Sequence, residues 1–111
     1  MQLQFEILNK IVQEVHKYRP FDYDSWRFEY KFNPDEGWSE YGVFFFRNHT
    51  EYLPPNFNYD LIIKFSQELH DEMQSHTGGD WRKFILNLDE QGKAKTQFIY
   101  EIQSCMDEFN D

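Results

Sequence analysis

Residues 81 to 100 carry the strongest pattern in the chain, and they predict a β-hairpin. Apolar side chains alternate with polar ones on both arms, and a period of two places them on one face of a strand. These are Phe84, Leu86 and Leu88 on the first arm and Ala94, Thr96, Phe98 and Tyr100 on the second. A polar turn that ends in Gly92-Lys93 separates the arms, which suits a hairpin connection.

The first half of the chain predicts a helix followed by a second hairpin. Residues 3 to 18 repeat apolar side chains every three or four positions, as an amphipathic helix does. Residues 25 to 32 alternate between aromatic and charged side chains, as a half-buried antiparallel strand does. A turn at 33 to 37 leads to a strand at 38 to 47. The nearly continuous apolar run of that strand, Val43 to Phe46, predicts that both of its faces are covered there.

Two more helices complete the expected fold. Residues 48 to 57 read as a loop, and residues 59 to 76 read as a helix that Gly78-Gly79 ends. A short helix at 101 to 109 would bury Ile102, Cys105, Met106 and Phe109. We therefore expect a single α+β domain over residues 1 to 111. Its antiparallel sheet of four or more strands comes from two hairpins, and two main helices and a short C-terminal helix pack on one face.

The charge balance limits the classes of partner. Asp and Glu number 20 against 11 Lys and Arg, a formal charge of −9. This argues against nucleic acid, whose phosphates need basic residues, and against an anionic membrane surface. It favours a basic protein partner, because complementary charge speeds the encounter of two proteins.

The sequence predicts a cytoplasmic protein. Cys105 is the single cysteine, so no disulfide can form within the chain. The N-terminus lacks the basic and apolar regions of a signal peptide. No stretch approaches the roughly 20 apolar residues that a membrane-spanning helix needs.

The residues that could carry chemistry form no known catalytic or metal-binding motif. His70 and His76 are six positions apart, about 600° around a helix, so they do not share a face as zinc ligands would. Gly78-Gly79 lacks the rest of a phosphate-binding loop. We expect no metal, no cofactor and no catalysis. A small enzyme that uses an acidic pair or the His70 region stays open as an alternative.

Acidic and aromatic residues between positions 22 and 41 are the candidate binding residues. The acidic ones would attract a basic partner and set the rate of association, whereas aromatic anchors usually dominate binding energy. The acidic candidates are Asp22, Asp24, Glu29, Asp35, Glu36 and Glu40, and the anchors are Trp38 and Tyr41.

The C-terminal hairpin resembles the signature of the YezG-like bacterial immunity proteins. In that family a Trp opens a strand, a Leu-Asp-x-x-Gly-Lys turn follows, and the next strand ends in an aromatic-x-Tyr pattern. The matching residues here are Trp81, Leu88-Asp89, Gly92-Lys93, Phe98 and Tyr100, and the likeness covers mainly residues 57 to 100.

This resemblance implies an antitoxin of a polymorphic or contact-dependent toxin system. Such a protein binds the C-terminal domain of its cognate toxin, often a nuclease, and blocks it by stoichiometric occlusion. The matching residues look like hairpin scaffolding, so the resemblance assigns none of them a role in binding. A self-associating scaffold or adaptor protein remains the alternative, in which a Phe-rich strand or a sheet edge pairs with a second copy to make a homodimer.

Overall fold

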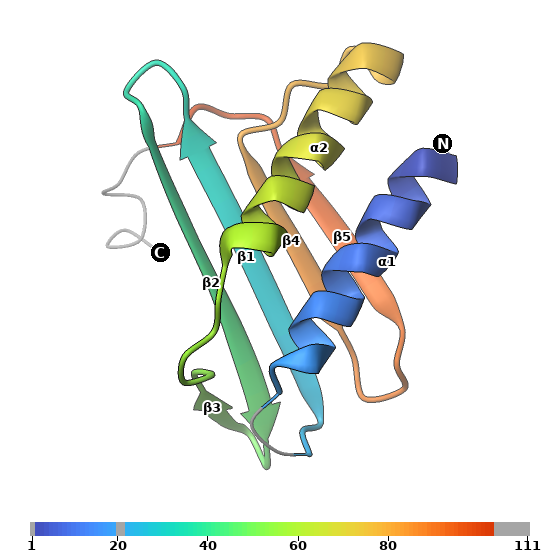
Figure 1. Ribbon diagram of the computed structural model, residues 1–111, viewed down its shortest axis with the longest axis vertical. Helices are drawn as coiled ribbons and strands as arrows, with labels where there is room; N and C mark the ends of the chain where they lie inside the picture. The colour runs from blue at the N-terminus through green and yellow to red at the C-terminus, as the bar shows by residue number, and fades with distance from the viewer. Residues whose placement is uncertain (1, 20–21, 104–111) are drawn as a thin grey trace.

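The computed structural model describes residues 2–19 and 22–103, which form a five-stranded sheet with two helices on one of its faces (Figure 1). Along the chain the elements are α1 (Gln2–Lys17), β1 (Ser25–Asn33), β2 (Trp38–Arg47), β3 (Thr50–Tyr52), α2 (Asp60–Thr77), β4 (Lys83–Leu88) and β5 (Ala94–Ile99). The α+β class and the two hairpins agree with the sequence prediction.

The sheet has the strand order β3-β2-β1-β4-β5, and each neighbouring pair is antiparallel. β1 lies at the centre because α2 carries the chain back across the sheet, so that β4 pairs with β1. The two helices lie side by side and run in opposite directions over the same face (Figure 1). Of the two helices described, neither is long and apolar enough to cross a membrane.

The core lies between the helices and the sheet, and aromatic rings fill much of it. Trp26, Phe28, Tyr30 and Phe32 of β1 all point into it, as their alternation predicts. The other buried apolar residues are Ile7, Ile11, Val15, Val43, Phe45, Ile62, Leu69, Trp81, Phe84 and Leu86.

Glycines and an aspartate shape the turns. Gly78 has a φ of 74° and its N–H donates to the Gln74 carbonyl, which ends α2 in a left-handed cap. In the turn from β4 to β5, the Asp89 carboxylate accepts the N–H groups of Gln91 and Lys93 at 2.9 and 2.8 Å. Gly92 has a φ of 78°, as expected for this turn. These bonds explain why the Leu-Asp-x-x-Gly-Lys motif suits a hairpin.

Two expectations about the secondary structure were wrong or incomplete. The predicted loop at 48–57 contains β3, a three-residue exposed strand too short and polar to show a pattern. Residues 101–103 are not helical, and Ile102 is 76% exposed instead of buried. The rest of the predicted C-terminal helix lies outside the described residues.

The run Val43–Phe46 does not have two covered faces. Both described helices lie on the other side of the sheet, and Phe44 and Phe46 are half-buried. The guanidinium of Arg27 lies 5.0 Å from the Phe44 ring and 5.5 Å from the Phe46 ring. The attraction between this cation and the two rings helps to stabilise the rings in a partly exposed position.

Candidate partner-binding surface

The structure divides the predicted binding residues among three places. Asp22 and Asp24 precede β1, whereas Asp35 and Glu36 lie in the turn after it. β1 has nine residues, and at about 3.3 Å per residue these two acidic groups are about 30 Å apart. The remaining predicted residues lie between these ends, on β1 and β2.

The turn between β1 and β2 is held by a compact set of hydrogen bonds. The Asn33 side-chain oxygen accepts the N–H groups of Asp35 and Glu36 at 3.0 and 3.1 Å. The Glu36 carboxylate accepts from the Asn33 side-chain amide at 2.8 Å and from the Trp38 indole at 3.0 Å. Gly37 has a φ of 74°, which the turn requires. Glu36 and Trp38 are therefore fixed relative to each other.

Glu29 and Glu40 lie on the sheet face that the helices leave open, and both are paired with cations. Glu29 contacts Arg27 at 2.9 Å and Lys83 at 3.3 Å. Glu40 lies 3.6 Å from Lys31, whose side chain is 5% exposed. The acidic residues of this face are thus largely neutralised, which the distribution of charge along the sequence did not indicate.

A hollow of about 590 Å³ lies on this open face. Gly42 is one of the residues that line it, and the Phe44 ring packs so closely there that a Cβ atom on Gly42 would come within 3.0 Å of the ring. We call the side chains in and beside it the open-face surface, defined as Glu29, Lys31, Trp38, Glu40, Phe44 and Lys83. Charges of both signs beside half-exposed rings can bind a protein surface by ion pairs and apolar contact together.

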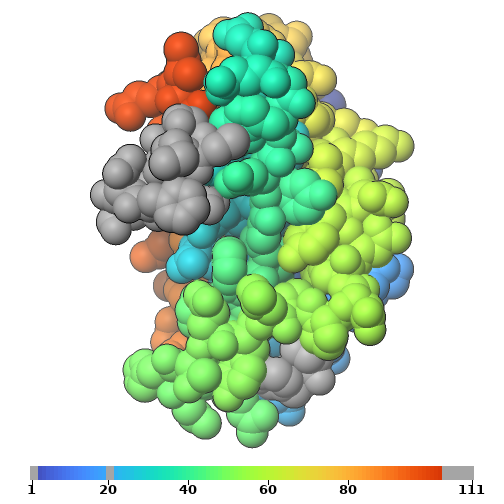
Figure 2. Space-filling model, turned by 90° about the vertical axis from the view of Figure 1, so that its left-hand side faces the viewer, coloured from blue at the N-terminus to red at the C-terminus, as the bar shows by residue number. Residues whose placement is uncertain are grey.

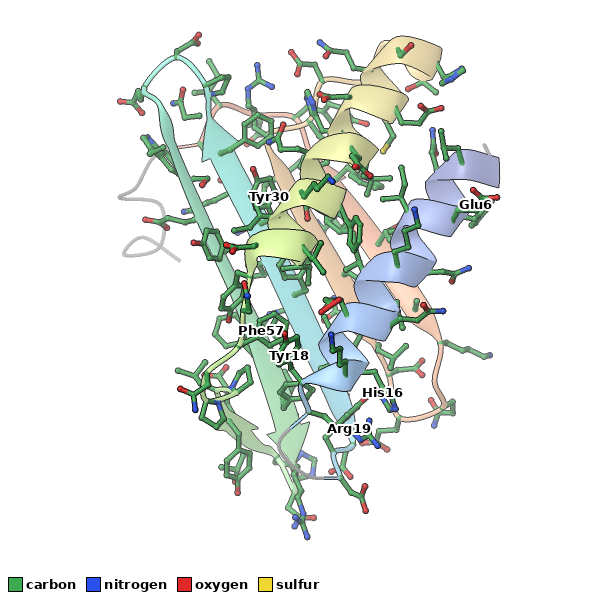
Figure 3. The ribbon with its side chains drawn as sticks, in the orientation of Figure 1. Glu6, His16, Tyr18, Arg19, Tyr30 and Phe57 are labelled. Carbon is green, nitrogen blue, oxygen red and sulfur yellow. The ribbon has the colours of Figure 1, made fainter. Side chains whose placement is uncertain are left out.

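Tyr41, the second predicted anchor, points to the helix side of the sheet. Its ring is 44% exposed and its centroid lies 4.9 Å from that of Tyr59. The Tyr59 ring is 4.5 Å from Phe57, which in turn is 4.8 Å from Tyr18 (Figure 3). Burial raises the pKa of the Tyr59 hydroxyl, so this group remains neutral. Sequence analysis missed this row because its members come from three separate segments.

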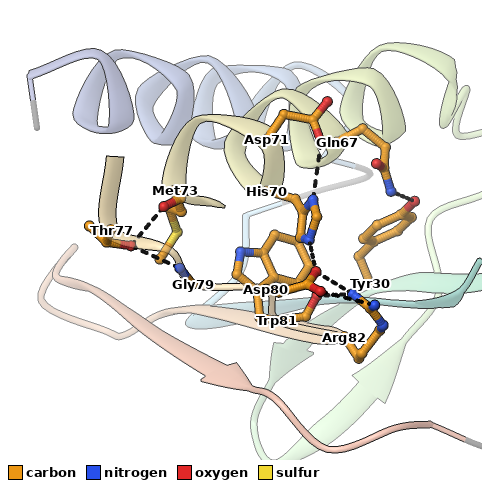
Figure 4. Close-up of polar contacts among 10 residues, drawn as sticks. All are labelled: Tyr30, Gln67, His70, Asp71, Met73, Thr77, Gly79, Asp80, Trp81 and Arg82. Carbon is orange, nitrogen blue, oxygen red and sulfur yellow. Dashed lines mark hydrogen bonds and ion pairs between the residues drawn. The ribbon is translucent and has the colours of Figure 1, made fainter. Parts of the chain in front are cut away.

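The His70 region forms a polar link between α2 and the start of β4 (Figure 4). His70 Nε2 lies 2.7 Å from the Asp80 carboxylate, and Nδ1 lies 3.1 Å from Asp71. Arg82 binds both carboxylate oxygens of Asp80, one of them at 3.1 Å. His70 is buried against Phe32 and Trp81. These contacts hold the helix to the sheet.

We expect the contacts of the Asp80 carboxylate to make the stability of the protein fall in acid. Hydrogen bonds from Arg82 and His70 lower the pKa of Asp80 below its ordinary value of 3.8. Its stabilising contribution is therefore complete above about pH 3.8 and is lost as the pH falls through the lower, folded pKa. We expect the free energy of unfolding of Asp80→Asn to change less than that of the wild type between pH 4.5 and pH 2.5, as measured by urea denaturation.

The control is Asp22→Asn, because Asp22 is an exposed aspartate that lies outside the helices and strands. It should retain the pH dependence of the wild type. An equal dependence in Asp80→Asn would show that Asp80 does not contribute to acid sensitivity.

Neither metal-ligating side chains nor similarity to known proteins assigns a function to this chain. Within residues 2–19 and 22–103, no three His, Cys, Asp or Glu side chains come together in a way that could hold a metal ion. Comparison with models of protein families found no match, and comparison with curated protein sequences found none either. The resemblance to the YezG-like immunity proteins therefore stays a prediction.

Proposed function

We propose that this protein is an immunity protein that binds the C-terminal domain of a cognate toxin and neutralises it by stoichiometric occlusion. In this proposal the toxin domain is basic and acts as a nuclease, and the protein itself has no catalytic activity. It acts in the cytoplasm, where the toxin domain would do its damage.

The observation that carries the proposal is the open-face surface. Both described helices pack on the other face of the sheet, so among the described residues no helix covers this one. The face offers a hollow, paired charges and half-exposed rings, which are features of a protein-binding surface.

The charge of the chain supports a basic partner, although the ion pairs change how the acidic residues would act. Glu29 and Glu40 are paired with lysines and would contribute mainly to orientation. Asp35 and Glu36 are exposed at the end of the hairpin, next to the open-face surface. Together with the net charge of −9, they would steer a basic domain toward this end of the sheet.

A pull-down of the tagged protein from its native cells, at low and at high salt, tests the proposal. The cells should be grown so that neighbours touch, and the bound proteins identified by mass spectrometry. We expect one basic C-terminal fragment of a large secreted protein, recovered less well at high salt. Recovery of the tagged protein alone, from cells shown to make a candidate toxin, would contradict the proposal and favour a self-associating scaffold.

Removing three charges at the end of the hairpin should slow binding of the recovered toxin domain. The variant is Asp35→Asn, Glu36→Gln and Glu40→Gln together, which keeps side-chain size and most hydrogen bonds. We expect its association rate to fall by about tenfold at low salt and much less at high salt, because steering is screened by ions. Surface plasmon resonance at two salt concentrations measures this.

The control is Glu6→Gln, Glu68→Gln and Glu90→Gln, which removes the same charge from exposed positions elsewhere. Its association rate should fall less than that of the first variant. Equal rates for the two variants would show that net charge alone matters and that the hairpin end has no special role.

A further inference from the structure

β2 extends well beyond the strand that lies outside it. β3 pairs only with Phe45, Phe46 and Arg47, at one end of β2. From Trp38 to Phe44, β2 has β1 on its inner side and, among the described residues, no strand on its outer side. Figure 2 looks onto this flank, where the upper part of β2 lies at the surface beside the start of α2. An edge of this kind is a template for another strand.

The main-chain groups that point outward here can be identified. The N–H of Val43 donates to the Tyr59 hydroxyl at 3.2 Å, so it points away from β1. Outward and inward groups alternate along a strand in an antiparallel sheet. The N–H and C=O groups of Ser39 and Tyr41 therefore point outward too, and no described residue bonds to them. These groups present two donors and two acceptors.

Different surfaces flank the two sides of this edge. On the helix side, the Tyr41 and Tyr59 rings form an aromatic shelf. On the open side are Trp38 and Glu40, and the hollow on that face is lined by Ser39 and Tyr41 as well. Alternate side chains of an incoming strand would therefore meet aromatic rings on one side and a carboxylate on the other.

Two registers in which a second copy of this chain could pair with the edge are unfavourable. If Ser39 of one copy paired with Tyr41 of the other, the two Glu40 residues would lie directly opposite each other, and like charges so placed destabilise a sheet. If the two Tyr41 residues paired with each other, Ser39 would lie opposite Val43, whose N–H is already bound by Tyr59. A net charge of −9 on each copy adds to the repulsion.

We propose that the edge of β2 at Ser39 and Tyr41 binds an extended segment of the toxin domain by antiparallel main-chain pairing. The segment belongs to a basic domain, which the net charge of −9 on this chain attracts, and its side chains on the helix side pack on the Tyr41 and Tyr59 rings. This inference rests on the proposed function and specifies how the partner is held.

Ser39→Pro tests the main-chain pairing, because proline lacks the outward N–H and is tolerated at the edge of a sheet. Ser39→Ala, which keeps the N–H, is the matched comparison. We expect Ser39→Pro to bind the toxin domain about tenfold more weakly than Ser39→Ala, because a carbonyl of the partner is left without its donor. Isothermal titration calorimetry gives the affinities, and circular dichroism checks that both variants are folded.

Hydrogen exchange of the wild-type protein gives an independent test that no folding defect can affect. Toxin binding should slow exchange at the amides of Ser39 and Tyr41. Tight binding with unchanged exchange at both amides would overturn this inference and leave the proposed function intact. Absence of binding by the wild type would overturn both.

Discussion

Trp81→Ala should lower the free energy of unfolding by about 3–5 kcal/mol, the usual range for removing a large buried aromatic side chain. Trp81 is fully buried and joins the two layers of the fold. Its ring contacts His70 on α2 at 5.1 Å between centroids, Phe32 on β1 at 5.8 Å and Phe84 on β4 at 5.7 Å. Alanine would leave a cavity that rigid strands cannot close.

Urea denaturation measures this effect directly. With a denaturant slope of about 1–3 kcal/mol per molar urea, the midpoint should fall by at least about 1 M. The free energy of unfolding of a small domain is only about 5–15 kcal/mol, so the variant would be only marginally stable. Trp81→Phe should cost clearly less, because it keeps a ring and removes an indole N–H that has no partner among the described residues.

Phe5→Ala is the comparison for Trp81→Ala, since Phe5 is an aromatic residue that is 65% exposed on α1. Its replacement should change stability by less than about 0.5 kcal/mol. Similar losses in Trp81→Ala and Phe5→Ala would contradict the packing described for the core.

Trp38→Ala should weaken binding of the toxin domain by about 2 kcal/mol, or roughly 30-fold, as expected for an aromatic anchor in an interface. Trp38 is half-buried on the open-face surface, and its indole is fixed by the hydrogen bond to Glu36. The Lys31 ammonium lies 5.9 Å from the ring. The ring is thus already held in place, so binding would cost little conformational entropy.

The affinity of Trp38→Ala can be compared with those of two other variants by calorimetry. Trp38→Phe keeps a ring but loses the hydrogen bond to Glu36, and it should fall between the wild type and Trp38→Ala. Phe5→Ala changes an exposed ring on the helix layer and should weaken binding far less. A folded Trp38→Ala protein with wild-type affinity would show that Trp38 is not an anchor.

Local patterns predicted most of the fold, whereas pairings between distant segments could not be predicted. The alternation from Trp26 to Phe32 identifies a strand because neighbouring side chains alone define its buried face. That β4 would pair with β1 depends on where α2 returns the chain. The prediction of two covered faces for Val43–Phe46 was wrong because the half-buried rings of Phe44 and Phe46 contact Arg27, which lies on the neighbouring strand β1.

In the candidate site, too, local patterns could be predicted but contacts between distant segments could not. Asp22 to Tyr41 are close in sequence, but β1 separates the two ends of that segment. The partner of Glu29 in an ion pair, Lys83, comes from β4, far along the chain. The shelf beside Tyr41 needs Tyr59, from the segment before α2. Sequence spacing therefore indicated the residue types, but the fold determines which of them act together.

The most direct test of the central claim is a titration of the toxin domain's activity with the purified protein. The toxin domain recovered in the pull-down is assayed for nuclease activity at a fixed concentration far above the dissociation constant. We predict that inhibition increases linearly and is complete at one protein per toxin domain, and that the protein alone cuts nothing. Full toxin activity in the presence of excess folded protein would contradict the proposal that this is an immunity protein.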